Sequence, residues 1–169
     1  MEQVILVDEQ DQPIGLEEKQ KAHELALLHR AFSVFLFREV DGERQVLLQQ
    51  RAQDKYHCGG LWTNTCCSHP REGETVQAAA TRRLREEMGI TAQLQAKGHF
   101  IYQAQFDNGL TEHELDHVLV GEFNGPVVSN PTEVAATRWL GVVALQKDML
   151  AQPNIYTPWL AQALELALA

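Results

Sequence analysis

Hydrophobic residues in the first third of the chain fall into short runs that are typical of strands. Val4–Asp8 is read as a short strand that is closed by a turn around Pro13 and Gly15. The continuous apolar run at residues 31–37 predicts a buried strand, and residues 17–28 between these runs have helical character. A strand, a turn, a helix and a buried strand are therefore expected in this order.

Turn signals and helical spacing organise the rest of the chain. The pattern predicts a hairpin turn at 41–42 into a strand at 44–51, a helix at 75–88 stopped by Gly89, strands at 99–106 and 112–123 around a turn at 107–109, and a last helix from about Thr157. Strands and helices are interleaved, but several strand pairs are hairpins. We therefore expect a single α/β or α+β domain spanning 1–169, with a mixed β-sheet sandwiched between helices.

Composition narrows the possible functions. The 169 residues carry a net charge of -9, which argues against nucleic acid because a phosphate-binding surface needs clustered Lys and Arg. No apolar run approaches the roughly 20 residues that span a bilayer, and the N-terminus lacks the basic start of a signal peptide. Three cysteines, two of them adjacent, are a poor framework for structural disulfides. A reducing, cytoplasmic setting is expected.

The stretch "TNTCCSHP" places Cys66 and Cys67 just before His69. This arrangement suits a metal site, a redox pair, or a proton-transfer site with one useful thiol. Ligation of a metal by all three residues is strained, because adjacent residues point in different directions and zinc sites usually separate their cysteines. In an extended segment Cys67 and His69 share one face, and Cys66 turns to the other.

A row of carboxylates lies in "LTEHELDHVLV". If this segment is a strand, Glu112, Glu114 and Asp116 share one face. On a buried face they would repel one another unless a cation lies between them. On an exposed edge strand the same residues would simply face water, and the periodicity leaves both interpretations open.

Histidines favour the cation. His23, His29 and His69 are each unremarkable alone, but together with the two same-face glutamates they make a nitrogen and oxygen ligand set. Zn²⁺ and Mn²⁺ accept such a mixture of imidazole and carboxylate.

The predicted helix at 75–88 and its flanks carry a further pattern, made of Glu74, Arg82, Glu86, Glu87, Gly89 and the aliphatic Ile90. This pattern resembles the Nudix box, a loop–helix–loop that holds divalent cations on a diphosphate. Ser68 stands where that box begins with glycine, and Arg83 replaces its central glutamate. The match supports the fold and one diphosphate-bound metal, but not a working pyrophosphohydrolase.

The segments "LLHRAFSVFLF", "LWTNTCCSHP", the altered Nudix box and "EHE" together resemble the type I isopentenyl diphosphate isomerases. The resemblance runs from about Lys19 to Trp159. It implies a reversible conversion of isopentenyl diphosphate into dimethylallyl diphosphate by a 1,3 proton shift, in a monomer or homodimer whose partner is this small substrate.

The resemblance also implies roles for individual residues. The implied catalytic residues are Cys67, Glu114, Tyr102 and Trp159. The implied ligands of one Mn²⁺ or Zn²⁺ are His23, His29, His69, Glu112 and Glu114, while Glu87 helps to hold Mg²⁺ on the substrate diphosphate. The implied diphosphate-binding residues are Lys19, Arg51, Lys55 and Arg83. For Trp159 a plain role as a core anchor of the last helix stays open.

Two other classes of protein compete with this interpretation. A Nudix pyrophosphohydrolase would use Glu86, Glu87 and magnesium, but it needs neither Cys67 nor a histidine-rich site, and Arg83 counts against it. A non-catalytic domain with a structural zinc would explain the histidines and cysteines, but it has no need of a diphosphate-binding box.

Overall fold

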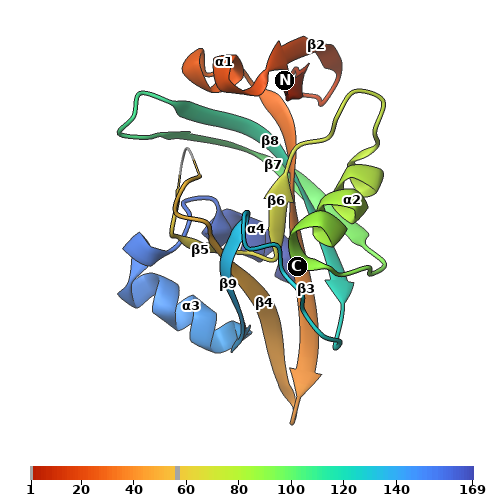
Figure 1. Ribbon diagram of the computed structural model, residues 1–169, viewed down its shortest axis with the longest axis vertical. Helices are drawn as coiled ribbons and strands as arrows, with labels where there is room; N and C mark the ends of the chain where they lie inside the picture. The colour runs from red at the N-terminus through yellow and green to blue at the C-terminus, as the bar shows by residue number, and fades with distance from the viewer. Residues whose placement is uncertain (1, 56–57) are drawn as a thin grey trace.

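A computed structural model of the chain describes residues 2–55 and 58–169 (Figure 1). The described residues form a mixed sheet of nine strands. The strands are β1 (Gln3–Val7), β2 (Pro13–Glu18), β3 (His29–Val40), β4 (Glu43–Arg51), β5 (Trp62–Thr63), β6 (Cys66–Ser68), β7 (Gln95–Gln105), β8 (Thr111–Glu122) and β9 (Val134–Gly141). The helices are α1 (Lys19–Glu24), α2 (Val76–Met88), α3 (Val142–Ala151), the 3-10 helix η1 (Pro153–Ile155) and α4 (Leu160–Leu168).

Strand β3 is the centre of the sheet. It pairs in parallel with β8 and antiparallel with β1, β4 and β6. The other pairs of hydrogen-bonded strands are antiparallel: β7 with β8, β4 with β5 and β9, and β1 with β2. The expected mixed sheet is confirmed.

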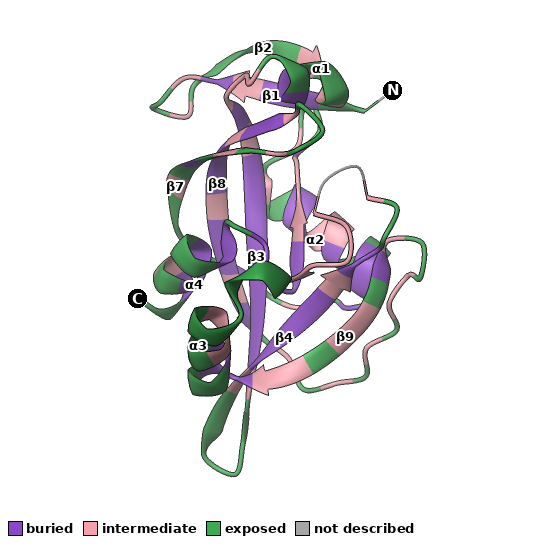
Figure 2. Cartoon of the chain, turned by 90° about the vertical axis from the view of Figure 1, so that its left-hand side faces the viewer, coloured by how far each residue is buried: buried purple, intermediate pink, exposed green. Residues whose placement is uncertain are grey.

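Alternate residues of β3 enter different cores, because successive side chains of a strand point to opposite faces. Val34 and Leu36 pack in a core with Leu84 and Met88 of α2. Phe35 and Phe37 pack in a second core with residues of α3 and α4, among them Leu145, Leu160 and Leu164. Figure 2 shows the resulting buried stripe along β3, β4 and β8, with helices on both sides. The sheet is sandwiched between helices, as expected.

Two predicted turns and the stop of the helix at 75–88 are confirmed by backbone geometry. Asp41 and Gly42 both have positive φ, 52° and 79°, which is the conformation of a tight hairpin turn between β3 and β4. Gly89 ends α2 with φ 65°, and a Cβ there would lie 2.5 Å from the Val128 carbonyl oxygen. Gly109, with φ 82°, lies in the turn between β7 and β8.

The N-terminal expectations need two corrections. The segment around Pro13 and Gly15 is strand β2 rather than a turn, and the turn lies earlier, where Asp8 Oδ1 accepts hydrogen bonds from two backbone N–H groups. Pro13 is tolerated because it opens an edge strand, where its missing N–H costs no ladder bond. The helix predicted over 17–28 is only α1, which ends before Ala26, a residue with φ 56°.

Strand β9 and helix α3 were not predicted from the sequence. The side chains of β9 alternate only weakly in burial, and its partner β4 lies far away in the chain. Helix α3 follows Gly141 with no side-chain cap, so the usual start signal is missing. The last helix, α4, begins at Leu160, close to the predicted start at Thr157.

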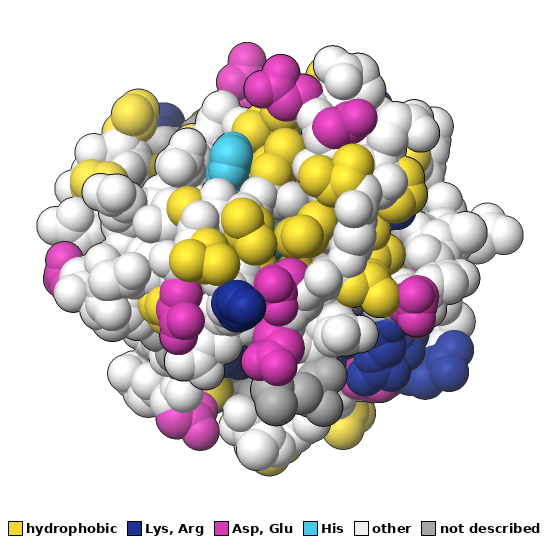
Figure 3. Space-filling view, turned by 90° about the horizontal axis from the view of Figure 1, so that it is seen from above, with side chains coloured by type: hydrophobic (Ala, Val, Ile, Leu, Met, Phe, Trp, Pro, Cys, Tyr) yellow, Lys and Arg dark blue, Asp and Glu magenta, His cyan; other side chains and the backbone are white. Residues whose placement is uncertain are grey.

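Acidic and hydrophobic side chains gather at one end of the molecule (Figure 3). Figure 3 shows the face beyond β2 and α1, where acidic side chains lie around a hydrophobic patch and most of the visible Lys and Arg surface is gathered at the lower right. In the described part of the chain, no helix is long and apolar enough to cross a bilayer.

Candidate active site

Residues from several of the sequence motifs line one pocket of about 230 Å³, whereas the predicted metal ligands His23 and His29 do not line it. Its lining includes all four predicted diphosphate-binding residues, and the acidic and thiol groups Cys67, Glu87, Glu112 and Glu114. The lining residues come from segments that lie far apart in the sequence, from Lys19 in α1 to Trp159 just before α4. The fold therefore brings the scattered motifs together.

Strand β8 decides between the two interpretations of its carboxylates. It lies between β3 and β7, so it is not an exposed edge. Glu112, Glu114 and Asp116 are all buried, with 2%, 7% and 2% of their surface exposed. The acidic face is therefore buried. Burial and the charge of Glu114 raise the pKa of Asp116 well above its usual range, so the row is stabilised by protonation, by compensating positive charge, or by both.

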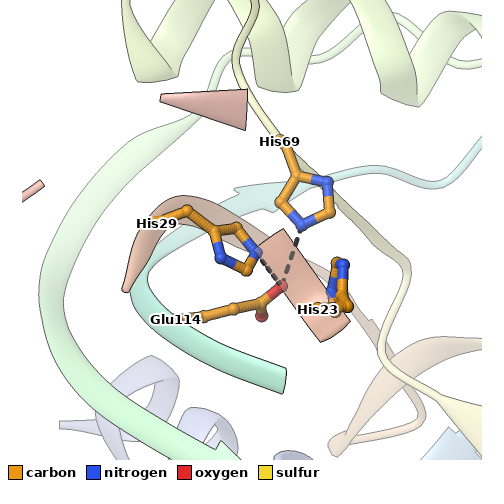
Figure 4. A group of neighbouring side chains, drawn as sticks. All are labelled: His23, His29, His69 and Glu114. Carbon is orange, nitrogen blue, oxygen red and sulfur yellow. Dashed lines mark hydrogen bonds and ion pairs between the residues drawn. The ribbon is translucent and has the colours of Figure 1, made fainter. Parts of the chain in front are cut away.

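Three histidines meet the middle carboxylate of this row. One ligand atom each from His23, His29, His69 and Glu114 lies within 4.8 Å of the others, and Figure 4 shows the three rings around the carboxylate. Glu114 Oε2 is 2.8 Å from His69 Nε2 and 3.3 Å from His29 Nε2. Glu112, the fifth predicted ligand, lies beside this group, with Oε2 3.9 Å from His23 Nε2.

Two of the rings are held in the orientation that a metal ligand needs. His23 Nδ1 donates to the Lys19 carbonyl at 2.7 Å, and His29 Nδ1 donates to the Leu27 carbonyl at 2.9 Å. A carbonyl can only accept, so the proton of each neutral ring is on Nδ1 and the Nε2 lone pair points into the cluster. The buried Nε2 atom of His29 makes no hydrogen bond within the described residues. These residues fit a divalent cation.

Electrostatics at the cluster supports the same conclusion. Burial lowers the pKa of His23 to about 3 and lowers that of His69 as well, so both rings are neutral. Burial alone would raise the pKa of Glu114, but its contacts with His29 and His69 outweigh this effect and lower it well below the usual range. Burial disfavours a charged His29 ring, but the contact with Glu114 outweighs this effect and raises the pKa of His29 above its usual value. A cation at this cluster would therefore find two neutral imidazoles and an ionised carboxylate ready as ligands and would compete with a proton on His29.

The thiol of Cys67 lies in a polar network on the β6 side of the pocket. Its Sγ donates to Asn64 Oδ1 at 3.0 Å and lies 3.6 Å from Ser33 Oγ, which in turn donates to both oxygens of Asp116. Burial, together with the charge of Asp116, raises the pKa of Cys67 to about 12. The group is therefore a thiol that retains its proton at neutral pH.

The two predicted aromatic residues lie next to each other. Trp159 is buried, lines the pocket, and donates from Nε1 to Asn64 Oδ1 at 3.2 Å. Tyr102 packs edge-on against it, with ring centroids 6.1 Å apart, and its hydroxyl makes no hydrogen bond to another described residue. Tyr102 is paired with Glu114 across β7 and β8 but does not line the pocket. Arg51 lies over the Trp159 ring at 5.6 Å.

Arg83 stands among the carboxylates at the end of α2. Its Nη2 donates to Glu87 at 2.5 Å and to Glu133 at 3.2 Å, while Lys55 also pairs with Glu133. Glu87 accepts a further bond from Gln49 at 3.0 Å and is 3% exposed. Of the box residues, Glu87 reaches the pocket, together with Arg83.

The remaining residues of the box hold the helix in place. Glu74 accepts two hydrogen bonds from Arg82, at 2.7 and 2.9 Å, and Glu86 pairs with Arg82 and Arg83 near the surface. Neither Glu74 nor Glu86 lines the pocket. The box carboxylates therefore do not gather into one acidic cluster that could hold a hydrolytic metal centre.

Sequence reasoning missed Glu2, Ser33 and Glu133, which line this pocket, and Asn64, which bonds Cys67. It placed Asp116 on the acidic face but did not predict its hydrogen bonds with Ser33. Asn64 lies within the quoted "TNTCCSHP" stretch, so its closeness to Cys67 was a usable signal. Ser33 and Glu133 carry no local signal, because only the pairing of β3 with β6 and the loop before β9 bring them to the site.

Comparisons with known proteins show the family of the chain. The NUDIX domain family model matches residues 27–160. A Burkholderia multivorans protein named isopentenyl-diphosphate Delta-isomerase is 49% identical, covering 98% of this chain and 93% of its own. A Photobacterium profundum protein of the same name is 48% identical, with 97% and 93% covered.

Solved structures show the same fold at low identity. A Deinococcus radiodurans protein superposes with a TM-score of 0.76 at 19% identity, covering 95% of this chain and 96% of that one. A MutT protein of Methanosarcina mazei gives 0.64 at 16% identity, with 82% and 91% covered. The chain belongs to the Nudix family and, within it, to the type I isopentenyl-diphosphate Delta-isomerases.

Proposed function

We propose that this enzyme interconverts isopentenyl diphosphate and dimethylallyl diphosphate, as a step of isoprenoid biosynthesis. The observation that carries the proposal is the presence of a protonated thiol, Cys67, and an ionised carboxylate, Glu114, in one pocket lined by four basic side chains. A 1,3 proton shift needs one acid and one base around a short hydrocarbon unit. The four basic side chains are suited to a diphosphate at the other end of that unit.

Cys67 and Glu114 divide the proton transfers between them in this proposal. The Cys67 thiol gives its proton to the terminal alkene carbon, which leaves a tertiary cation. Glu114 then takes a proton from the carbon next to the oxygen-bearing one, and the double bond forms in its new position. A thiol with a pKa of about 12 suits the donor role, since it is protonated at rest. The reverse reaction exchanges the two roles.

Trp159 lies where it can stabilise the cation. Its indole ring lines the pocket beside the network that holds Cys67. The face of an indole attracts a positive charge by an interaction worth about 2 kcal/mol when water is excluded. Tyr102 supports this ring from its edge rather than facing the pocket.

The charge of the pocket supports the proposal that the diphosphate binds together with a metal. The lining holds six carboxylates, including Glu2, Glu87 and Glu133, but only four Lys and Arg side chains. A diphosphate entering this excess of negative charge requires a divalent cation. Glu87 is the carboxylate beside Arg83 that would share Mg²⁺ with the substrate.

The cluster of His23, His29, His69 and Glu114, with Glu112 beside it, would hold one Mn²⁺ or Zn²⁺. When bound, the cation supplies positive charge that sets the proton affinity of Glu114. The histidine orientations fixed by the Lys19 and Leu27 carbonyls support this assignment.

Three further expectations belong to the same proposal. We propose that residues 1–169 act as one domain and that the enzyme functions as a monomer or a homodimer. A cytoplasmic location is proposed as well, since the described cysteines, Cys58, Cys66 and Cys67, are all free thiols and Cys67 must stay reduced to donate a proton.

Incubation with isopentenyl diphosphate and Mg²⁺ tests the proposal. Conversion to dimethylallyl diphosphate, followed by NMR of the hydrocarbon part, is the expected result. Release of inorganic phosphate instead would favour a hydrolase, and recovery of unchanged substrate by metal-loaded protein would favour a non-catalytic domain. The small pocket predicts that nucleoside diphosphate derivatives are not substrates, because typical sites for larger ligands measure about 300–1,000 Å³.

A further inference from the structure

Asn64 is a fully buried amide between β5 and β6 that does not line the pocket. Its Nδ2 donates to the carbonyl oxygens of Val34 and Cys66, both at 3.0 Å. These carbonyls only accept hydrogen bonds, so the amide is held in one orientation. Its Oδ1 is thereby directed at the opposite side, where hydrogen-bond donors gather.

Two of those donors are the groups assigned to the chemistry. Asn64 Oδ1 lies 3.0 Å from Cys67 Sγ and 3.2 Å from Trp159 Nε1. The third donor is the Thr63 hydroxyl at 2.9 Å. One oxygen therefore holds the thiol of β6 and the indole that precedes α4, which come from segments more than 90 residues apart in sequence.

We propose that Asn64 is a positioning residue for the isomerisation, which fixes the Cys67 thiol and the Trp159 ring relative to each other. The proposal rests on the function proposed above. A bond to Nε1 lies in the plane of the indole and stops the ring from rotating, and it does not itself cover a ring face; Arg51 lies over the ring at 5.6 Å. The same oxygen sets the direction of the Cys67 side chain.

The number of donors explains how the thiol can still release its proton to substrate. A carbonyl oxygen has two lone pairs, but three donors surround Asn64 Oδ1. The S–H group is the weakest of the three. When the thiol turns to the alkene, Trp159 still donates to this oxygen, and Thr63 does so as well when Thr157 donates its own hydroxyl proton to Thr63. Losing the S–H contact therefore leaves no buried acceptor unpaired.

Substitution of Asn64 by Ser removes the acceptor from reach of both groups, whereas Asn64→Asp retains it. A buried Asp is favoured in its protonated form, in which it can donate to one carbonyl and accept from the thiol and the indole. We expect kcat of Asn64→Ser to fall about tenfold or more, a loss within the range for a positioned acid. Its KM should change little, because the diphosphate supplies the binding, and Asn64→Asp should recover part of the activity.

Thr65→Val is the matched control. Thr65 is equally buried in the same turn, and its hydroxyl accepts from Leu36 N and donates to the Leu47 carbonyl, so that side chain bonds neither Cys67 nor Trp159. We expect a lower melting temperature with an unchanged kcat. If Thr65→Val loses as much kcat as Asn64→Ser, or if folded Asn64→Ser keeps wild-type kcat, the positioning role is wrong.

A second readout does not depend on turnover. The three indole N–H signals in a ¹H–¹⁵N spectrum can be assigned with Trp159→Phe, and the Trp159 signal should move upfield and exchange faster in Asn64→Ser while those of Trp62 and Trp139 stay in place. An unmoved Trp159 signal would contradict the proposed positioning role of Asn64.

A variant that does not fold leaves a second route. If Asn64→Ser does not fold, Trp159→Phe, which keeps a ring but lacks the N–H, is tested instead, and an unchanged kcat would contradict the proposal. A wild-type enzyme without isomerase activity would contradict the proposed function, while the indole signal would still report on the hydrogen bond between Asn64 and Trp159.

Discussion

Cys66 and Cys67 are neighbours in the chain, but their side chains lie on opposite faces of β6. Cys66 is fully buried in the core with Leu84 and Met88 of α2, whereas Cys67 lines the pocket with His69. This is the arrangement expected for an extended segment, in which residues two apart share a face. Chain proximity therefore does not make the two thiols equivalent.

The two serine variants should differ sharply in activity. Cys67→Ser removes the proposed proton donor, and turnover should fall about 10²-fold or more. Cys66→Ser should keep most of its activity and lose about 1–2 kcal/mol of unfolding free energy, because a hydroxyl replaces a thiol in an apolar core. Initial rates with isopentenyl diphosphate and chemical denaturation measure both effects. An inactive Cys66→Ser enzyme beside an active Cys67→Ser enzyme would reverse the assignment.

Removal of one cluster histidine should remove the metal. Purified protein is expected to contain about one transition-metal ion and to need added Mg²⁺ for turnover. His29→Ala should lose at least tenfold in metal affinity, a loss of the size seen even for groups that only support a ligand. His113→Ala is the control: it lies on β8 as well, but its ring bonds the Ala26 carbonyl outside the cluster. Elemental analysis gives the metal content. Full activity of metal-free protein with magnesium alone would contradict the site.

The sequence predicted those features of the site that depend on short-range periodicity. The division of Cys66 from Cys67, and the shared face of Glu112, Glu114 and Asp116, follow from the two-residue repeat of a strand, and both are confirmed. The exposure of that acidic face was left undecided, because burial of β8 depends on its pairing with β3 and β7. Periodicity reports which residues share a face but not what covers it.

Features that depend on distant pairing could not be predicted. Glu133 reaches Lys55 and Arg83 because β9 pairs with β4, which brings the residue just before β9 close to the end of β4. Neither segment alone carries a sequence signal for this pairing. The early end of the first helix depends on Ala26, whose positive φ is unusual for a residue other than glycine. Such a conformation is imposed by the surrounding structure and has no signal in residue type.

Arg83 predicts that the enzyme does not hydrolyse diphosphates. Its guanidinium bonds Glu86, Glu87 and Glu133, so it occupies the place where a hydrolase of this fold would gather metal-binding carboxylates. Neither isopentenyl diphosphate nor nucleoside diphosphate derivatives should release phosphate. Colorimetric phosphate assays run beside the isomerase assay check this, with the same protein sample serving as its own activity control. Hydrolysis at about 1 s⁻¹ or faster, near ordinary enzyme turnover, would contradict the prediction.

A tyrosine that does not line the active-site pocket should limit the stability of the fold at alkaline pH. The hydroxyl of Tyr156 donates to Asp148 at 2.5 Å, and burial together with this carboxylate raises the pKa of Tyr156 to about 12. Because the unfolded-state pKa is near 10, the contribution of this group to stability is fully present below pH 10 and is lost as the pH rises from 10 to 12. At neutral pH, Tyr156→Phe should cost about 1.5 kcal/mol, the usual value for a hydrogen bond to a charged group. Urea unfolding across this pH range should show the wild type and Tyr156→Phe converging toward pH 12. A constant difference between them at every pH would mean that the hydroxyl does not titrate with folding.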